Sequence, residues 1–200
     1  MNDTYKTIAR FSEGIYKEKS GRFLSFAHPV KTTDEIKSMV EKYRKEYYDA
    51  RHVCYAYMLG HERKIFRACD DGEPSGTAGK PILGQINSRE LTDVLVVVVR
   101  YFGGIKLGTS GLISAYKAAA ADALENNEIV EKTVDEEISI KFEYPFLNEV
   151  MRIVKEEHPE IIRQSFDTDC LMILGIRKSE AEKLKSRLLK VETLTINGSK

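Results

Sequence analysis

The order of apolar and polar positions predicts alternating strands and helices over the first 130 residues. An amphipathic helix is expected over residues 33–48, after a capping box in which Thr32 caps the first turn and Glu35 reaches back to the Thr32 amide. Residues 94–99 are rich in β-branched side chains, as is typical of a strand buried on both faces. The other predicted strands are 5–16, 22–30, 53–58 and 64–68, and the other predicted helices are 77–89 and 109–126.

After residue 127 the pattern changes to that of a second, smaller unit. In order, it predicts a half-buried strand at 138–144, a helix opened by Pro145, strands near 161–166 and 170–176, a helix behind a Ser179–Glu182 capping box, and a strand at 194–196. This β-α-β-β-α-β order is that of a ferredoxin-like unit. We therefore expect an α+β protein with two domains, residues 1–130 and 135–200.

Composition excludes several classes of protein. The 200 residues are 42% hydrophobic and 31% charged, which indicates a folded chain, and 31 basic residues balance 31 acidic ones. Bulk charge therefore does not direct the chain to nucleic acid or membranes. No apolar run approaches the roughly 20 residues that span a bilayer, no apolar segment of a signal peptide is visible, and the three cysteines have no C-x-x-C spacing. We expect a cytoplasmic protein without a membrane partner.

The first segment with candidate chemistry, residues 70–81, combines carboxylates, glycines and prolines just before a predicted helix, and is called here the acidic segment. Thr77 is the expected helix N-cap, which would leave the amides of residues 78–80 free to attract an anion, with Lys80 adding a positive charge. The alternative is a well-capped turn with solvated acids. The signature residues of the acidic segment are Asp71, Gly72, Glu73, Pro74, Gly76, Thr77 and Gly79.

The second segment, residues 100–111, follows the buried strand and precedes a long helix, and is called here the basic segment. A glycine-rich loop between strand and helix binds phosphate in several folds, but neither G-x-x-x-x-G-K-[ST] nor G-x-G-x-x-G is present. The alternative is a tight connection whose glycines permit close packing. The candidate anion- or nucleic-acid-binding residues are Lys80, Arg100, Tyr101, Gly103, Gly104, Lys106, Gly108 and Thr109, with Phe102 also available for stacking.

The sequence contains little that indicates catalysis or a resident metal. The histidines form no metal-binding pair, and no catalytic residue is identifiable. Asp70, Asp71 and Glu73 could hold Mg²⁺ together with a phosphate ligand, but nothing in the sequence makes them converge. His52 and Cys54 would share a strand face, which permits a Cys–His nucleophile, although a buried structural cysteine is the more common use.

Four blocks of the sequence, in this order, resemble the Impact family in its bacterial, YigZ-type form. The resemblance covers roughly residues 10–127, and the residues 135–200 resemble the small C-terminal domain of these bacterial members. The chain departs from the family at two places. Ser20-Gly21 stands where the family commonly has these two residues in the opposite order, Gly-Ser, and Ser114 stands where an arginine is common. The blocks are residues 52–57, 71–81, 100–108 and 111–116.

The resemblance implies a first domain like the second domain of ribosomal protein S-five and a second, ferredoxin-like domain like the later domains of elongation factor G. Eukaryotic Impact proteins regulate translation, with the help of an additional N-terminal domain, and no established catalytic activity accompanies the bacterial family. Since both fold relatives work on the ribosome, the resemblance implies a translation-associated regulator that binds RNA or a ribosomal surface.

Two other classes of function stay open from the sequence. One is an enzyme acting on a small phosphorylated metabolite, with Mg²⁺ held by the acidic segment. The other is a protein-interaction module in which both segments are only structural. We further predict that the acidic and basic segments adjoin in one surface concavity, and that Asp71 and Glu73 pair there with Arg100 or Lys106.

Overall fold

The computed structural model describes residues 3–197, which divide into two compact units. One unit is Tyr5–Lys132, and the other contains the described residues from Thr133 onward together with Asp3 and Thr4. Among residues 3–197, no helix combines the length and the apolar character needed to cross a membrane. Each unit has its own buried core and is described separately.

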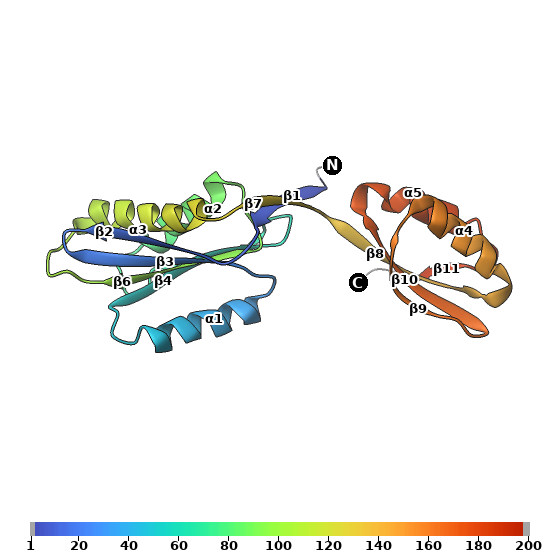
Figure 1. Ribbon diagram of the computed structural model, residues 1–200, viewed down its shortest axis with the longest axis horizontal. Helices are drawn as coiled ribbons and strands as arrows, with labels where there is room; N and C mark the ends of the chain where they lie inside the picture. The colour runs from blue at the N-terminus through green and yellow to red at the C-terminus, as the bar shows by residue number, and fades with distance from the viewer. Residues whose placement is uncertain (1–2, 198–200) are drawn as a thin grey trace. The chain divides into compact units, whose positions relative to one another are not determined.

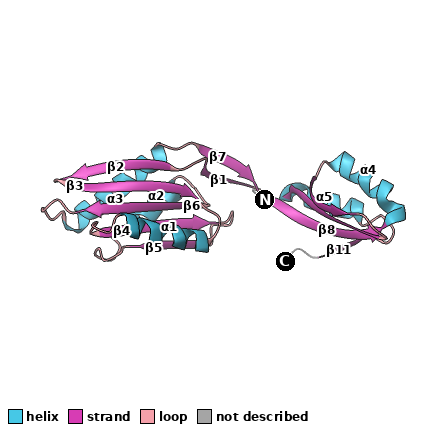
Figure 2. Cartoon of the chain, turned by 60° about the horizontal axis from the view of Figure 1, so that its bottom comes forward, coloured by secondary structure: helices cyan, strands magenta, loops and turns pink. Residues whose placement is uncertain are grey.

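The first unit is built on a five-stranded antiparallel sheet of order β2-β3-β6-β4-β5 (Figure 2). Helix α1 covers one face of this sheet, and α2 and α3 cover the other (Figure 1). Its elements are β1 (Thr4–Ile8), β2 (Ser12–Glu18), β3 (Gly21–Pro29), α1 (Thr33–Glu46), β4 (His52–Leu59), β5 (Ile65–Cys69), α2 (Gly79–Ser88), β6 (Val94–Tyr101), α3 (Gly108–Glu125) and β7 (Ile129–Thr133), of which β1 and β7 pair separately.

The central strand β6 explains the two-layered core of this unit. Val94, Val96 and Val98 pack against α2 and α3, whereas Leu95, Val97 and Val99 pack toward α1. All six side chains are fully buried, so the predicted strand with two buried faces is confirmed. Because side chains alternate along a strand, one hydrophobic run supplies both cores.

Three local predictions differ from the structure. Thr32 caps α1 by accepting from the Glu35 amide at 3.2 Å, but the Glu35 carboxylate accepts from the amide of Lys31, one residue before the expected partner. The expected strand at 5–16 is divided into β1 and β2. The Ser179–Glu182 capping box is wrong, because α5 begins directly after β10, with Arg177 at its N-cap and no side-chain cap.

The second unit has the predicted ferredoxin-like order. Its antiparallel sheet has the strand order β11-β8-β10-β9, and buried side chains of α4 and α5 complete its core. This permutation, in which the first and third strands are central, is the split βαβ arrangement. The elements are β8 (Asp135–Glu143), η1 (Tyr144–Phe146), α4 (Leu147–Glu157), β9 (Glu160–Ser165), β10 (Asp169–Arg177), α5 (Lys178–Leu188) and β11 (Thr195–Asn197).

Candidate anion-binding site

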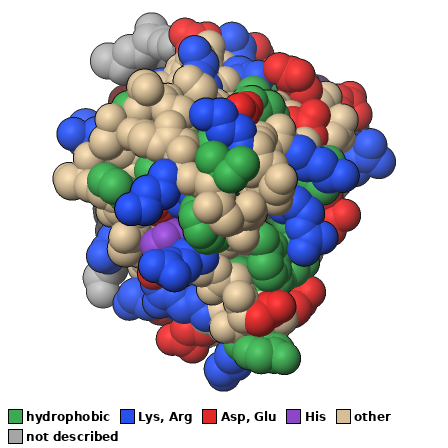
Figure 3. All heavy atoms as spheres, turned by 90° about the vertical axis from the view of Figure 1, so that its left-hand side faces the viewer, with side chains coloured by type: hydrophobic (Ala, Val, Ile, Leu, Met, Phe, Trp, Pro, Cys, Tyr) green, Lys and Arg blue, Asp and Glu red, His purple; other side chains and the backbone are tan. Residues whose placement is uncertain are grey.

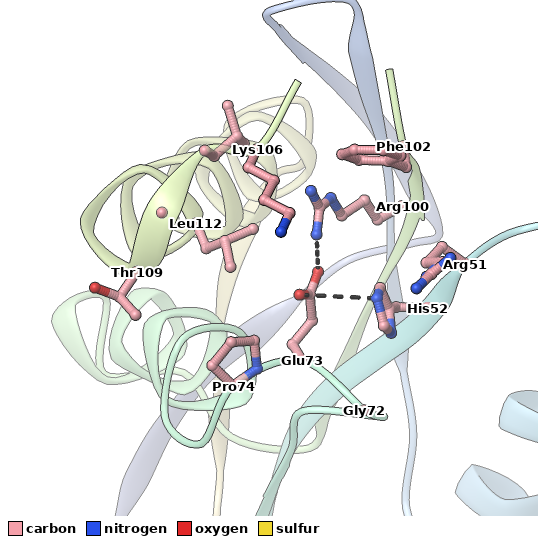
Figure 4. Close-up of a pocket in the computed structure, with 12 residues that line it drawn as sticks. Arg51, His52, Gly72, Glu73, Pro74, Arg100, Phe102, Lys106, Thr109 and Leu112 are labelled. Carbon is pink, nitrogen blue, oxygen red and sulfur yellow. Dashed lines mark hydrogen bonds and ion pairs between the residues drawn. The ribbon is translucent and has the colours of Figure 1, made fainter. Parts of the chain in front are cut away.

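A surface pocket of about 460 Å³ lies where the acidic and basic segments meet in the first unit. The start of β4, the acidic segment, the end of β6 and the start of α3 all contribute to its wall (Figure 4). The two segments therefore adjoin in one concavity, as the sequence predicts. The lining residues are Arg51, His52, Gly72, Glu73, Pro74, Arg100, Phe102, Lys106, Leu107, Gly108, Thr109 and Leu112.

An ion pair between Glu73 and Arg100 lies in this pocket. Arg100 Nη1 donates to Glu73 Oε1 at 2.5 Å. The Arg100 side chain is only 9% exposed, and the Glu73 side chain only 3%. The buried Tyr116 hydroxyl donates to the same carboxylate oxygen at 2.8 Å. The predicted pairing of Glu73 with Arg100 is thus confirmed, whereas Asp71 pairs with Arg44.

The guanidinium of Arg100 is only partly satisfied by the protein. Its Nε atom is buried and has no hydrogen-bond partner. The rings of Phe23 and Phe102 each lie 5.6 Å from the guanidinium carbon. A buried donor without a partner costs free energy, so the fold holds Arg100 at the pocket wall at a cost.

His52 presents a free ring nitrogen to the ion pair. Its Nδ1 lies 2.7 Å from the carbonyl oxygen of Asp71, and since a carbonyl only accepts, Nδ1 carries the proton. In the neutral ring, Nε2 therefore keeps its lone pair, 3.8 Å from Glu73 Oε2.

The N-terminus of α3 adds uncapped amides to the pocket. No side chain caps this 18-residue helix, and its first turn contains no acidic residue. Lys106, Gly108 and Thr109 line the pocket at this helix end. An uncapped helix N-terminus beside a lysine and an arginine favours an anion. On this side of the molecule, Lys and Arg side chains gather around a histidine (Figure 3).

The N-terminus of α2, by contrast, is already occupied. The Asp70 carboxylate accepts from the amides of Gly76, Ala78 and Gly79 at 2.8–3.0 Å. The predicted Thr77 N-cap is wrong: α2 begins at Gly79, and the Thr77 hydroxyl donates to the Pro74 carbonyl. Burial raises the pKa of Asp70, but the three amides and nearby Lys80 outweigh it, so the pKa lies below its ordinary value.

Several residues expected at the site lie outside the pocket. Lys80 is exposed on α2, with its side chain against Gly76. The Tyr101 hydroxyl donates to Asp49, and Arg22 lies over the Tyr101 ring. The other predicted site residues that do not line it are Asp71, Gly76, Thr77, Gly79, Gly103 and Gly104, and Ser114 does not line it either.

Two of these glycines have a packing role. A Cβ added at Gly103 would lie 2.1 Å from the backbone carbon of Ser20, and one at Gly79 would lie 2.4 Å from the amide nitrogen of Cys69. Both distances are far below any real carbon contact, so close backbone approach requires glycine at both positions.

Sequence reasoning missed Arg51, and it considered His52 only as a partner of Cys54. Both residues enter the pocket because His52 pairs in register with Arg100 across β4 and β6. The signal that could have found them is therefore the register between two adjacent strands.

The carboxylates of the acidic segment have separate partners rather than a common point. Asp70 caps α2, Asp71 binds Arg44 and the Val53 amide, and Glu73 binds Arg100 and Tyr116. Within residues 3–197, no group of three or more His, Cys, Asp or Glu side chains is arranged to hold a metal ion. The geometry offers no shared ligand set for Mg²⁺.

Cys54 is a buried structural thiol. Its Sγ lies 2.9 Å from the Asp70 carbonyl oxygen and 3.3 Å from the Tyr116 hydroxyl. Burial raises the pKa of this thiol well above its usual range, although the Tyr116 hydrogen bond opposes the shift. A thiol that stays protonated is a poor nucleophile, so the structure does not support Cys54 as a nucleophile activated by His52.

Comparison with known proteins identifies the family. The Impact N-terminal domain matches residues 19–124, more than half of the chain. The Impact family member YvyE of Bacillus subtilis is 36% identical over 78% of this chain and 72% of its own. YigZ of Escherichia coli is 32% identical over 85% of this chain and 84% of its own.

A solved structure described as a hypothetical protein covers 100% of this chain and 99% of its own, with 28% identity and a TM-score of 0.77. The similarity therefore extends over both units, as the predicted two-part α+β fold requires. On the match to the family domain and on the relatives that share more than 30% identity, this chain belongs to the Impact family.

Proposed function

We propose that this protein is a translation-associated regulator that binds RNA, free or at a ribosomal surface, through the pocket between the acidic and basic segments. Membership of the Impact family supports the regulatory part, since the resemblance already implies a role in translation. The pocket supports the RNA part, and the observation that carries it is the buried, partly unsatisfied guanidinium of Arg100 beside the uncapped N-terminus of α3.

The groups around the pocket match the chemistry of a nucleotide. Arginine and lysine side chains and helix N-termini are the usual phosphate ligands in proteins. Phe102 is 46% exposed, and its ring is therefore available to a base. Base–aromatic stacking contributes about 1–3 kcal/mol per base without reading sequence.

Charge limits the expected affinity. The chain has no net charge, so nonspecific attraction over the whole surface is weak. Three cations line the pocket, Arg51, Arg100 and Lys106. If each neutralises one phosphate of a single strand, the logarithm of the association constant falls with the logarithm of salt concentration with a slope of about −2.

The test is a fluorescence-anisotropy titration of single-stranded RNA, and of purified ribosomes by sedimentation, at several salt concentrations. Lys106→Ala removes an exposed pocket cation and is expected to weaken binding and to flatten the slope by about 0.7. Lys80→Ala, an exposed lysine outside the pocket, is the matched control and should bind like the wild type. Undetectable binding of both RNA and ribosomes at low salt would overturn the proposal.

A further inference from the structure

We propose that the ligand group of this pocket is a terminal phosphate, the phosphomonoester at one end of an RNA strand, rather than an internal phosphodiester. This inference rests on the proposed function and specifies its ligand. Three features of the pocket carry it: the depth of Arg100, the charge balance of the lining, and the number of separate phosphate-binding groups.

Depth is the first feature. The Arg100 side chain is 91% buried, yet it lines the pocket and keeps an unpartnered Nε. Nη1 is directed at Glu73, while the opposite edge of the guanidinium faces the space between Lys106 and Phe102 (Figure 4). A terminal phosphate can enter this space. An internal phosphodiester has a sugar on each side, which would hold it at the rim.

Charge is the second feature. The lining contains three cations, Arg51, Arg100 and Lys106, and one carboxylate, Glu73, which leaves two positive charges when His52 is neutral. A phosphomonoester carries about −1.5 to −2 charges at pH 7, whereas an internal phosphodiester carries one. The pocket therefore matches the charge of a monoester and would be left with an excess positive charge around a diester.

The number of donor groups is the third feature. Arg100 lies at the end of β6, and the Lys106 ammonium and the uncapped first turn of α3 lie together at the start of that helix, which gives three donor groups on two sides of the pocket. A phosphomonoester has three terminal oxygens, one for each of these groups, and a diester has two. Arginine can bind two phosphate oxygens at once through its planar fork, which a lysine cannot reproduce.

Phe102 gives the pocket a place for the last base. Its ring lies over Arg100 and is 46% exposed, beside the space where the phosphate would enter. A nucleotide whose phosphate reaches Arg100 could stack its base on the exposed part of this ring. The preference is therefore for a phosphate attached to a nucleoside rather than for inorganic phosphate.

The test compares one 12-nucleotide RNA, labelled internally, in three forms: with a 5′-phosphate, with a 3′-phosphate, and with hydroxyls at both ends. We expect one phosphorylated form to bind at least tenfold more tightly than the hydroxyl form in anisotropy titrations. The comparison between the 5′ and 3′ forms identifies which end is bound. A nucleoside monophosphate should displace the tighter RNA at lower concentration than inorganic phosphate does.

Two variants connect the preference to the pocket. Lys106→Ala and Arg100→Lys should both reduce it at least fivefold, the second because the charge stays and the fork is lost, whereas Lys80→Ala should preserve it. Thermal melts identify any variant that fails to fold. If Arg100→Lys does not fold, the result for Lys106→Ala alone decides whether the preference depends on the pocket.

The outcomes separate this inference from the proposed function. Equal affinity for the three RNAs overturns the inference and leaves RNA binding in place. No binding of any of the three RNAs overturns the inference, and if ribosomes are not bound either, the proposed function is overturned with it. This holds even if a nucleoside monophosphate stabilises the protein, because the ligand would then be a small metabolite.

Discussion

Glu73 and Arg100 form an ion pair at 2.5 Å in which both side chains are at least nine-tenths buried. Such a pair is a costly way to stabilise a fold, because removing two charges from water offsets most of their attraction. Its position at the wall of a pocket indicates another use: Glu73 holds Arg100 in place beside the space that a ligand would enter.

Replacing Glu73 should separate stability from binding. Glu73→Gln keeps the shape but leaves Arg100 without its counter-charge, and we expect a loss of about 3 kcal/mol in the free energy of unfolding. Anion affinity should rise, because the carboxylate that competes with the ligand is gone. Urea unfolding and phosphate-dependent thermal shifts measure the two effects. Lys6→Ala breaks an exposed ion pair, and it should change neither quantity appreciably.

Asp70 should stabilise α2 in a pH-dependent way. Its folded-state pKa lies below its ordinary value, so its contribution is present above the unfolded pKa of about 3.9 and is lost as the pH falls through the folded pKa. Asp70→Asn should cost about 1–2 kcal/mol at pH 7, as loss of a helix cap does. Urea midpoints for both proteins should converge as the pH falls below 4; a constant difference would contradict this role.

Gly103 should tolerate no side chain. Gly103→Ala forces a methyl group into the backbone at Ser20 and Gly21, and we expect at least 2 kcal/mol of destabilisation. Gly84 is the matched control: it lies inside α2 with open space around it, so Gly84→Ala should stabilise the protein by about 0.5–1 kcal/mol. Unfolding in guanidinium chloride tests whether Gly103→Ala lowers the free energy of unfolding and Gly84→Ala raises it. An unchanged free energy of unfolding for Gly103→Ala would refute the close-packing argument.

Those parts of the structure that depend on local pattern could be predicted from the sequence. The hydrophobic run at 94–99 predicts a central strand, and the element order after residue 135 predicts the ferredoxin-like sheet. The meeting of the acidic and basic segments follows because each precedes a helix on the same face of the sheet. Strand β7 was missed, since its side chains are mostly exposed and show no alternation.

The missed features depend on contacts between residues that the pattern does not connect. Asp70 caps α2 from nine residues before its first residue, so no capping signature marks it. Arg51 reaches the pocket through the pairing of β4 with β6, which depends on strand register. The direction of the Tyr101 side chain depends on Asp49 and Arg22 in other parts of the fold.

The most direct test of the central claim is an NMR titration of the ¹⁵N-labelled protein with single-stranded RNA at low salt. If RNA binds in the pocket, the largest shifts fall on the backbone amides of residues 106–109 and on the Nε–H of Arg100, with small shifts in the second unit. Shifts confined to residues outside the pocket, or an unchanged Arg100 Nε–H at saturating RNA, would contradict it.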